Sequence, residues 1–340
     1  MRHEVVAAPR WYSTHDASRG QTRRYLRSAI STRPGSASSG SGVRSATMRA
    51  VYSTVQVSET TVVGSFAVPD GPGPFPGVVA LSGSGGGVPG WWGGLLAPHG
   101  IAVLAAAYFG DEPLPSALCE IPVETVASAG AWLRERPEIR GGRVGLVGGS
   151  KGAELALLAA TVYPDLFGPV AAIAPSCVTW FGVDLTGSVA DASARSSWTI
   201  DGQPVPFVPP VPGVDFERTD RGLRSVGIYA AALEQTDAVA AAAIAVERAT
   251  GPLLLLSGGD DGACPSTVMA QMIVERMQAH GRGTEVRHLD FPECGHVVVR
   301  PWPPGEAPSM PFDNGGTDEA LDAAHDAALP AVANHLSEPG

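Results

Sequence analysis

Hydrophobic and polar positions change period several times along residues 51–336, and these changes predict the elements of the fold. Two β-rich segments, 51–57 and 61–68, flank a polar turn and predict a hairpin. Short and mostly apolar runs then follow, and such runs are typical of strands that are buried on both faces. They are FPGVVALSG (75–83), IAVLAAAY (101–108), RVGLVG (143–148), VAAIAP (170–175), PLLLLSG (252–258) and TEVRHLDF (284–291).

Helical patterns separate these runs, so strand and helix alternate along most of the chain. The alternation predicts an α/β fold whose sheet is mostly parallel and carries helices on both faces. The predicted helices cover residues 116–136, 151–162, 234–249, 267–280 and 317–336.

Residues 176–232 interrupt the alternation with aromatic residues, prolines and polar residues. We expect an insertion after the sixth strand, built of hairpin and extended loop. Ligands of α/β enzymes bind at the carboxyl ends of the strands, where an insertion of this kind forms a lid or a pocket wall. The alternative is a surface excursion with no role in binding.

The first 48 residues differ in composition from the rest. They hold eight arginines against Glu4 and Asp16, whereas the whole chain has a net charge of −11. Residues 31–48 are rich in Ser and Gly and lack a hydrophobic period, so we predict a disordered tail over 1–48 and a folded domain over 49–340. The tail is either an extension upstream of Met48 or an Arg/Ser-rich targeting peptide.

Composition excludes several function classes. A net charge of −11 repels nucleic acid and anionic membranes, so neither is an expected partner. No apolar run approaches the roughly 20 residues that span a bilayer, and no secretory signal is apparent, so we expect a cytoplasmic protein. The cysteines form no CxxC pair and lack histidines at zinc-ligand spacing, which predicts buried free thiols, no cofactor and no metal. They are Cys119, Cys177, Cys264 and Cys294.

The segment GGSKG, residues 148–152, matches the pattern G-x-S-x-G between a predicted strand and a predicted helix. In a nucleophile elbow the serine adopts a strained backbone conformation, and a bulky residue two positions away would collide with the turn. Ser150 is therefore the candidate nucleophile. The alternative is an ordinary Gly/Ser turn that caps the helix.

Two later strand ends supply an acid and a base. Asp261 follows PLLLLSG, and His296 follows TEVRHLDF in a loop preceded by glycine. A serine needs a neutral imidazole to take its proton and a carboxylate to orient that imidazole. The order Ser150, Asp261, His296 is the order found in α/β-hydrolases. Asp260 is the rival acid, and the other histidines lie in predicted strands or helices, in the tail, or just before a strand.

The tetrahedral intermediate requires two N–H donors for its oxyanion. One is the backbone N–H of Lys151, and the other is expected from the glycine loop at Gly85, Gly86 and Gly87, with Gly86 favoured over its neighbours. The alternative for the three glycines is a flexible turn. The side chain of Lys151, the only lysine in the chain, is expected to face solvent or an anionic ligand. Glu154 is expected to be structural, in the first turn of the helix.

Several longer segments resemble the C-terminal hydrolase domain of the acyl-CoA thioesterase and bile acid-CoA:amino acid N-acyltransferase family. They include GSGGG, HGIAVLAAAYFGDEPLP, RPEIRGGRVGLVGGSKGAELAL, WTIDGQPVPFVPP, GGDD and FPECGHVVVRPWPP, and the resemblance runs from about residue 50 to 336. It implies an α/β-hydrolase fold and hydrolysis of an acyl-CoA thioester by Ser150, Asp261 and His296 through an acyl-enzyme. The family's N-acyltransferase branch is similar but looks like it uses cysteine at the position of Ser150, which favours hydrolysis.

Two alternatives to this interpretation remain. One is a carboxylesterase or dienelactone-hydrolase-like enzyme on the same fold, so the expected small-molecule partner is an acyl thioester or an ester. The other is a non-catalytic binding module that retains the fold. No arginine cluster marks a site for the phosphates of CoA, although Arg282 and Arg300 are candidates. No pattern indicates an oligomeric state.

Overall fold

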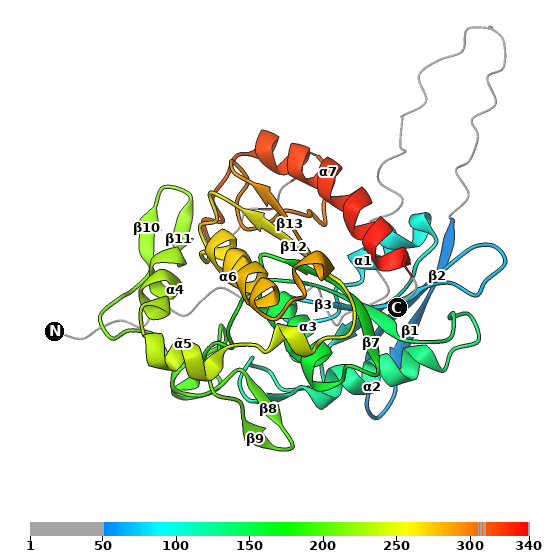
Figure 1. Cartoon of the computed structure of the whole chain (residues 1–340), viewed down its shortest axis with the longest axis horizontal. Coiled ribbons are helices and arrows are strands. Elements are labelled where there is room, and N and C mark those ends of the chain that lie inside the picture. The colour runs from blue at the N-terminus through cyan, green and yellow to red at the C-terminus, as the bar shows by residue number, and fades with distance from the viewer. Residues whose placement is uncertain (1–50, 305, 307, 309–310, 339–340) are drawn as a thin grey trace, which may run out of the picture.

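The computed structural model describes residues 51–304, 306, 308 and 311–338, so the tail predicted over residues 1–48 lies outside the described part of the chain. An eight-stranded sheet has the order β1-β2-β4-β3-β6-β7-β12-β13 (Figure 1). β1 and β2 form the predicted hairpin, β2 is also antiparallel to β4, and the remaining neighbours are parallel. In chain order, the strands of this sheet are Tyr52–Ser58 (β1), Val63–Pro69 (β2), Gly77–Leu81 (β3), Ala102–Ala107 (β4), Val144–Gly149 (β6), Phe167–Ile173 (β7), Leu253–Gly258 (β12) and Val286–Phe291 (β13).

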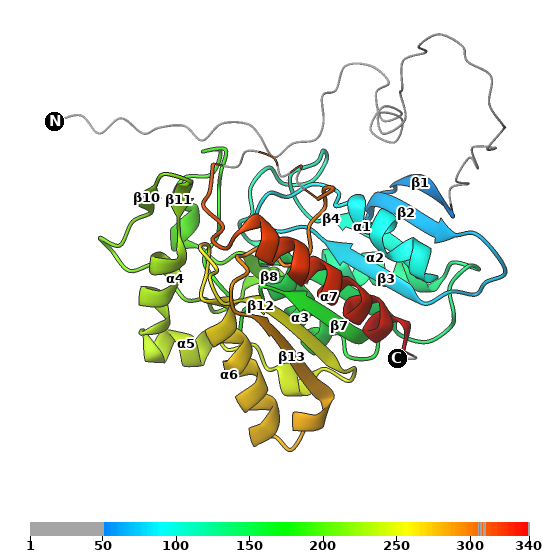
Figure 2. The same cartoon turned by 90° about the horizontal axis from the view of Figure 1, so that it is seen from above.

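Helices cover both faces of this sheet, as the alternation of the sequence predicts (Figure 2). One hydrophobic core contains residues of α2 (Glu124–Arg134), α3 (Lys151–Val162) and α6 (Ser266–Ala279). The other contains residues of α1 (Trp91–Leu96) and α7 (Asp318–Ser337). Both cores need apolar side chains from the same strands, which explains the nearly continuous apolar runs.

Consecutive strand residues divide between the two cores. Val78 belongs to the core under α1 and α7, and Val79 belongs to the core under α2, α3 and α6. Leu254 and Leu255 alternate in the same way on β12. This period of two confirms that the predicted runs are strands of a doubly covered sheet.

The segment 176–232 follows β7, the sixth strand of the large sheet in chain order, as predicted. It contains β8 (Trp198–Ile200), which forms a small sheet with β5 (Ile121–Pro122) and β9 (Gln203–Pro204). A second hairpin, β10 (Glu217–Thr219) and β11 (Gly222–Arg224), leads into α4 (Val226–Leu233), and both views place these elements away from β1 and β2.

Two helix predictions need correction, and two helices were not predicted. The helix predicted over 116–136 begins only at Glu124, because residues 121–122 pair with β8. The helix predicted over 234–249 is shorter, with α5 at Thr236–Ala242 and a 3-10 turn at Val246–Arg248, because Ala243 bridges to Val178. α1 and α4 were not predicted, since WWGGLL holds two glycines and VGIYAAAL is too uniformly apolar to show a helical period.

None of the helices in the described ranges is long and apolar enough to cross a membrane. All four cysteines are free, as predicted, but Cys119 is only half-buried while the other three are buried. Cys119 differs because it lies in the irregular segment that precedes β5.

Candidate active site

Ser150 occupies a sharp turn between β6 and α3. Its backbone has φ 56° and ψ −121°, a conformation that L-residues rarely adopt. Its backbone N–H donates to the carbonyl of Ile173 at the end of β7. The Ser150 hydroxyl makes no capping hydrogen bond to α3, so the ordinary N-cap considered above does not describe this turn.

The two outer glycines of GGSKG are required by close backbone contacts. A Cβ atom on Gly148 would lie 2.3 Å from the carbonyl oxygen of Gly152, and one on Gly152 would lie 2.3 Å from the carbonyl oxygen of Ser82. A Cβ atom on Gly149, by contrast, would meet no atom within 4 Å. The spacing of the motif therefore follows from the packing of the turn against α3 and the loop after β3.

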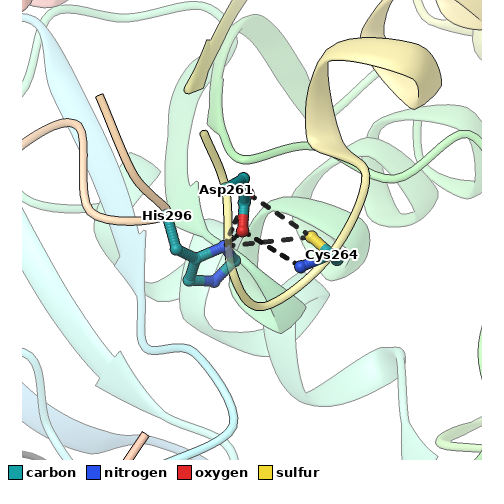
Figure 3. Close-up of side chains that lie close together, drawn as sticks. All are labelled: Asp261, Cys264 and His296. Carbon is teal, nitrogen blue, oxygen red and sulfur yellow. Dashed lines mark hydrogen bonds and ion pairs between the residues drawn. The ribbon is translucent and has the colours of Figure 1, made fainter. Parts of the chain in front are cut away.

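Asp261 and His296, from the loops after β12 and β13, form a hydrogen-bonded pair (Figure 3). Nδ1 of His296 lies 3.0 Å from Oδ1 and 2.9 Å from Oδ2 of Asp261. Oδ1 also accepts from the backbone N–H groups of Ala263 and Cys264, and Oδ2 accepts from the hydroxyl of Ser266 at 2.6 Å. These bonds fix the carboxylate and leave Nε2 of His296 as the ring nitrogen directed away from it.

Burial and pairing shift both pKa values. Burial alone would raise the pKa of Asp261, but the charge of His296 and the hydrogen bonds lower it below its ordinary value. Burial alone would lower the pKa of His296, but the charge and hydrogen bond of Asp261 outweigh burial and raise it. The pair thus stabilises a protonated imidazole, which is the species that a general base becomes.

A loop just before α7 holds both members of the pair in place. The carbonyl of Asn314 accepts from the backbone N–H of His296 at 2.7 Å and from that of Gly262 at 3.1 Å, and Gly315 bridges to Asp261. Sequence reasoning missed this loop. Its signal was the turn sequence Asp313-Asn314-Gly315-Gly316, in which both glycines have positive φ.

The side chain of Asp260, the alternative acid, contacts Arg224 and Gly316 instead of His296. Its side chain is 53% exposed, pairs with Arg224 at 3.7 Å and accepts from the backbone N–H of Gly316 at 2.8 Å. The structure therefore brings Asp261, and not Asp260, to His296. Cys264 also lies beside the pair. Burial and the carboxylate of Asp261 raise the pKa of its thiol well above the ordinary value, which disfavours the nucleophilic thiolate.

Ser150, Asp261 and His296 all follow parallel strands and so lie at the same edge of the sheet. Among the hydrogen bonds between described residues, none joins Ser150 to His296. Catalytic hydrogen bonds are often long in the absence of substrate and tighten when it binds.

The glycine loop after β3 lies beside Ser150. A Cβ atom on Gly83 would lie 3.5 Å from Cβ of Ser150. The N–H of Gly86 donates to the carbonyl of Gly83, and the N–H of Gly87 donates to that of Phe109, so both have partners within the protein. The Tyr108 hydroxyl donates to the carbonyl of Ser82 at 2.7 Å and anchors the loop.

Lys151 does not face solvent or a ligand site, which corrects the expectation from sequence. Its side chain is 5% exposed, and its ammonium lies 3.1 Å from the carboxylate of Glu154, which is 1% exposed. The ammonium also donates to the Ser197 hydroxyl and to the carbonyl of Phe181. Glu154 is structural as expected, although its partners include residues of the insertion as well as the helix dipole.

The two arginines considered as candidates for binding CoA phosphates also pair with other groups of the protein. Arg282 precedes β13, at the opposite edge of the sheet from Ser150, and pairs with Glu285 and backbone carbonyls. Arg300 is buried and pairs with Asp322 of α7 at 2.7 Å. A cavity of about 400 Å³ does lie beside the His296 loop, and its lining includes Gly295, Val297 and Trp302.

Comparison with known proteins identifies the family of the chain. Residues 121–314 match the family model described as BAAT / Acyl-CoA thioester hydrolase C terminal, which spans more than half of the chain. The chain belongs to this family. The matched region contains Ser150, Asp261, His296 and the whole insertion.

Relatives from this family include both hydrolases and transferases. Mouse acyl-coenzyme A thioesterase 6 is 34% identical over 76% of this chain and 57% of its own length, and human acyl-coenzyme A thioesterase 1 is 36% identical over 72% of this chain and 53% of its own length. Mouse acyl-coenzyme A amino acid N-acyltransferase 2 is 30% identical over 73% of this chain and 55% of its own length. The chain thus spans little more than half the length of these relatives.

Solved structures show the same fold at lower identity. A dienelactone hydrolase-like promiscuous phosphotriesterase from metagenomic libraries is 15% identical, with a TM-score of 0.52 over 85% of this chain and 99% of that one. This likeness confirms the α/β-hydrolase fold predicted from sequence.

Proposed function

We propose that this protein hydrolyses acyl-CoA thioesters to a free acid and CoA through an acyl-enzyme on Ser150. The observation that carries the proposal is the strained, non-capping Ser150 at the same sheet edge as the preformed Asp261–His296 pair. The thioesterases among its family relatives suggest the substrate class.

In this mechanism Nε2 of His296 takes the proton of the Ser150 hydroxyl, while Asp261 holds Nδ1–H and stabilises the imidazolium. The Ser150 oxygen attacks the thioester carbonyl, the C–S bond breaks, and the imidazolium gives its proton to the departing sulfur, so that CoA leaves as its thiol and the imidazole is neutral again. Water, deprotonated by the same imidazole, then attacks the acyl-serine and releases the acid. Both steps pass through a tetrahedral oxyanion.

Backbone N–H groups would bind that oxyanion. Lys151 is the first residue of α3, so its N–H has no partner within the helix and lies at the positive end of the helix dipole. The second donor would come from the loop after β3. Since the N–H groups of Gly86 and Gly87 already have partners, Gly85 and its N-terminal neighbours in that loop are the better candidates.

The insertion, residues 176–232, would form the wall of the acyl pocket. It packs on the nucleophile's helix through Glu154, which accepts from the backbone of Trp180 and the indole of Trp198. Trp180, Phe181 and Tyr229 form an aromatic cluster within it. An apolar wall of this kind suits a fatty acyl chain better than a polar acid.

The test is thiol release from short, medium and long acyl-CoAs, run beside p-nitrophenyl esters, for the parent protein and Ser150→Ala. Release of CoA by the parent, abolished in Ser150→Ala, is the expected result. Turnover of esters alone would instead identify a carboxylesterase. Mass spectrometry of products formed with an amino acid such as glycine present would reveal amide formation, which would overturn the hydrolase assignment in favour of N-acyl transfer.

A further inference from the structure

Cys264 lies beside the Asp261–His296 pair, in a position that hydrolysis does not use. Its Sγ is 3.7 Å from Oδ2 of Asp261 and 3.8 Å from Nδ1 of His296, and those two atoms are 2.9 Å apart. Figure 3 shows the three side chains converging. Within the described residues, this is the group of three His, Cys, Asp or Glu side chains whose donor atoms are close enough to share a metal ion.

The chemistry and the spacing of these atoms fit a thiophilic divalent cation. Zinc binds thiolate sulfur at about 2.3 Å and imidazole nitrogen or carboxylate oxygen at about 2.0–2.2 Å, so tetrahedral donors are about 3.3–3.6 Å apart. The separations of 2.9, 3.7 and 3.8 Å lie within a few tenths of an ångström of that range. Three protein donors leave a fourth position for water.

We propose that Asp261, Cys264 and His296 form an inhibitory site for Zn²⁺ and similar cations. On binding, the Cys264 thiol releases its proton to solvent and forms a metal–sulfur bond. The proton on Nδ1 of His296 moves to Nε2, and the Nδ1 lone pair coordinates the ion together with an oxygen of Asp261. An imidazole that carries its proton on Nε2 cannot accept the proton of Ser150, so the metal-bound protein is inactive.

Metal binding itself does not depend on the proposed function, so it is tested first without an activity assay. Co²⁺ is the probe, because a thiolate ligand gives cobalt a charge-transfer absorption and a tetrahedral site gives intense visible bands. We expect both in the parent protein and in Cys177→Ser, a control at another buried free cysteine. We expect loss of the charge-transfer band in Cys264→Ser and Cys264→Ala, with folding of each verified by circular dichroism. An identical spectrum in all four proteins, or none in any, overturns the site.

The inhibitory effect rests on the proposed function and is tested with Zn²⁺ and a p-nitrophenyl ester, since CoA released from a thioester would itself bind the metal. Each variant is compared with its own metal-free rate. Loss of the sulfur ligand should raise the half-inhibiting Zn²⁺ concentration by at least about 10-fold, because loss of even an outer-shell partner typically weakens metal affinity by about 10- to 100-fold, while Cys177→Ser should match the parent. A chelator should restore the rate. Equal inhibition of Cys264→Ser and parent overturns the proposal. Absence of both ester turnover and CoA release in every metal-free protein counts against the proposed function, and the cobalt spectra still decide the site.

Discussion

The ammonium of Lys151 lies 3.1 Å from the carboxylate of Glu154, and this buried ion pair joins the helix that follows Ser150 to the insertion. The ammonium of Lys151 donates to the Ser197 hydroxyl at 2.8 Å, and the carboxylate of Glu154 accepts from the indole N–H of Trp198 at 2.6 Å. The pair therefore fixes the first turn of α3, and with it the backbone N–H of Lys151, against the proposed pocket wall.

Replacing Lys151 by Met should be strongly destabilising, because it leaves the carboxylate of Glu154 buried without a cation. Loss of one partner of a buried pair typically lowers the free energy of unfolding by about 3–5 kcal/mol. The double variant Lys151→Met/Glu154→Gln should be less destabilised than the sum of the two single changes, as measured by urea unfolding. The exposed Glu275→Gln of α6 serves as the control and should change stability by less than about 0.5 kcal/mol. Additive effects at positions 151 and 154 would show that the pair is not coupled.

Substitutions of Gly148 and Gly149, two neighbouring glycines before Ser150, test the close packing of the turn. Gly148→Ala places a Cβ atom 2.3 Å from a backbone oxygen, so the backbone must move. We expect a loss of about 1–3 kcal/mol in the free energy of unfolding, together with loss of ester hydrolysis, since the same turn positions Ser150. Gly149→Ala is the matched control, because its Cβ enters open space, and it should keep most of its activity. Similar behaviour of the two variants would contradict the close packing of the turn.

The fold and the positions of the site residues in it could be predicted because they depend on local patterns. The run VGLVGG followed by Lys151 predicts both the end of β6 and the start of α3, since a buried strand and a helical period meet there. Asp261 was favoured over Asp260 from its position before Pro265, and the structure directs Asp261 to His296.

The side-chain environments were not predictable, because they depend on residues far away in the sequence. Lys151 is buried only because Phe181 and Ser197, 30 and 46 positions later, supply acceptors for its ammonium. Likewise, no residue near Cys264 in the sequence indicates that its thiol lies beside a histidine, because His296 follows the next strand, β13, 32 positions later. Predicting contacts of this kind requires the register of every strand pair in the sheet, which local sequence patterns do not give.

The assignment of the triad acid is tested by two adjacent aspartates. Asp261→Asn removes the charge that orients His296, and loss of the corresponding charge in a serine triad lowers kcat by about 10⁴-fold. Asp260→Asn should retain activity, because Asp260 contacts Arg224 and the backbone of Gly316 instead of the imidazole. Both variants are compared by kcat for thioester and ester hydrolysis. A larger loss in Asp260→Asn would reverse the assignment.

The pH dependence of kcat/KM tests the same pair through its titration. Asp261 raises the pKa of His296 above its ordinary value of 6.5 against the opposing effect of burial. Only neutral imidazole accepts the proton of Ser150, so activity should fall as pH decreases through this raised pKa, and the midpoint should lie above pH 6.5. In Asp261→Asn the carboxylate is gone and burial remains, so the midpoint should move to lower pH even though the maximal rate is reduced. The profile is measured from about pH 5 to about pH 9 with a chelator present, so that metal binding at His296 does not compete with the proton. An unchanged midpoint in Asp261→Asn would mean that His296 does not titrate as the catalytic base.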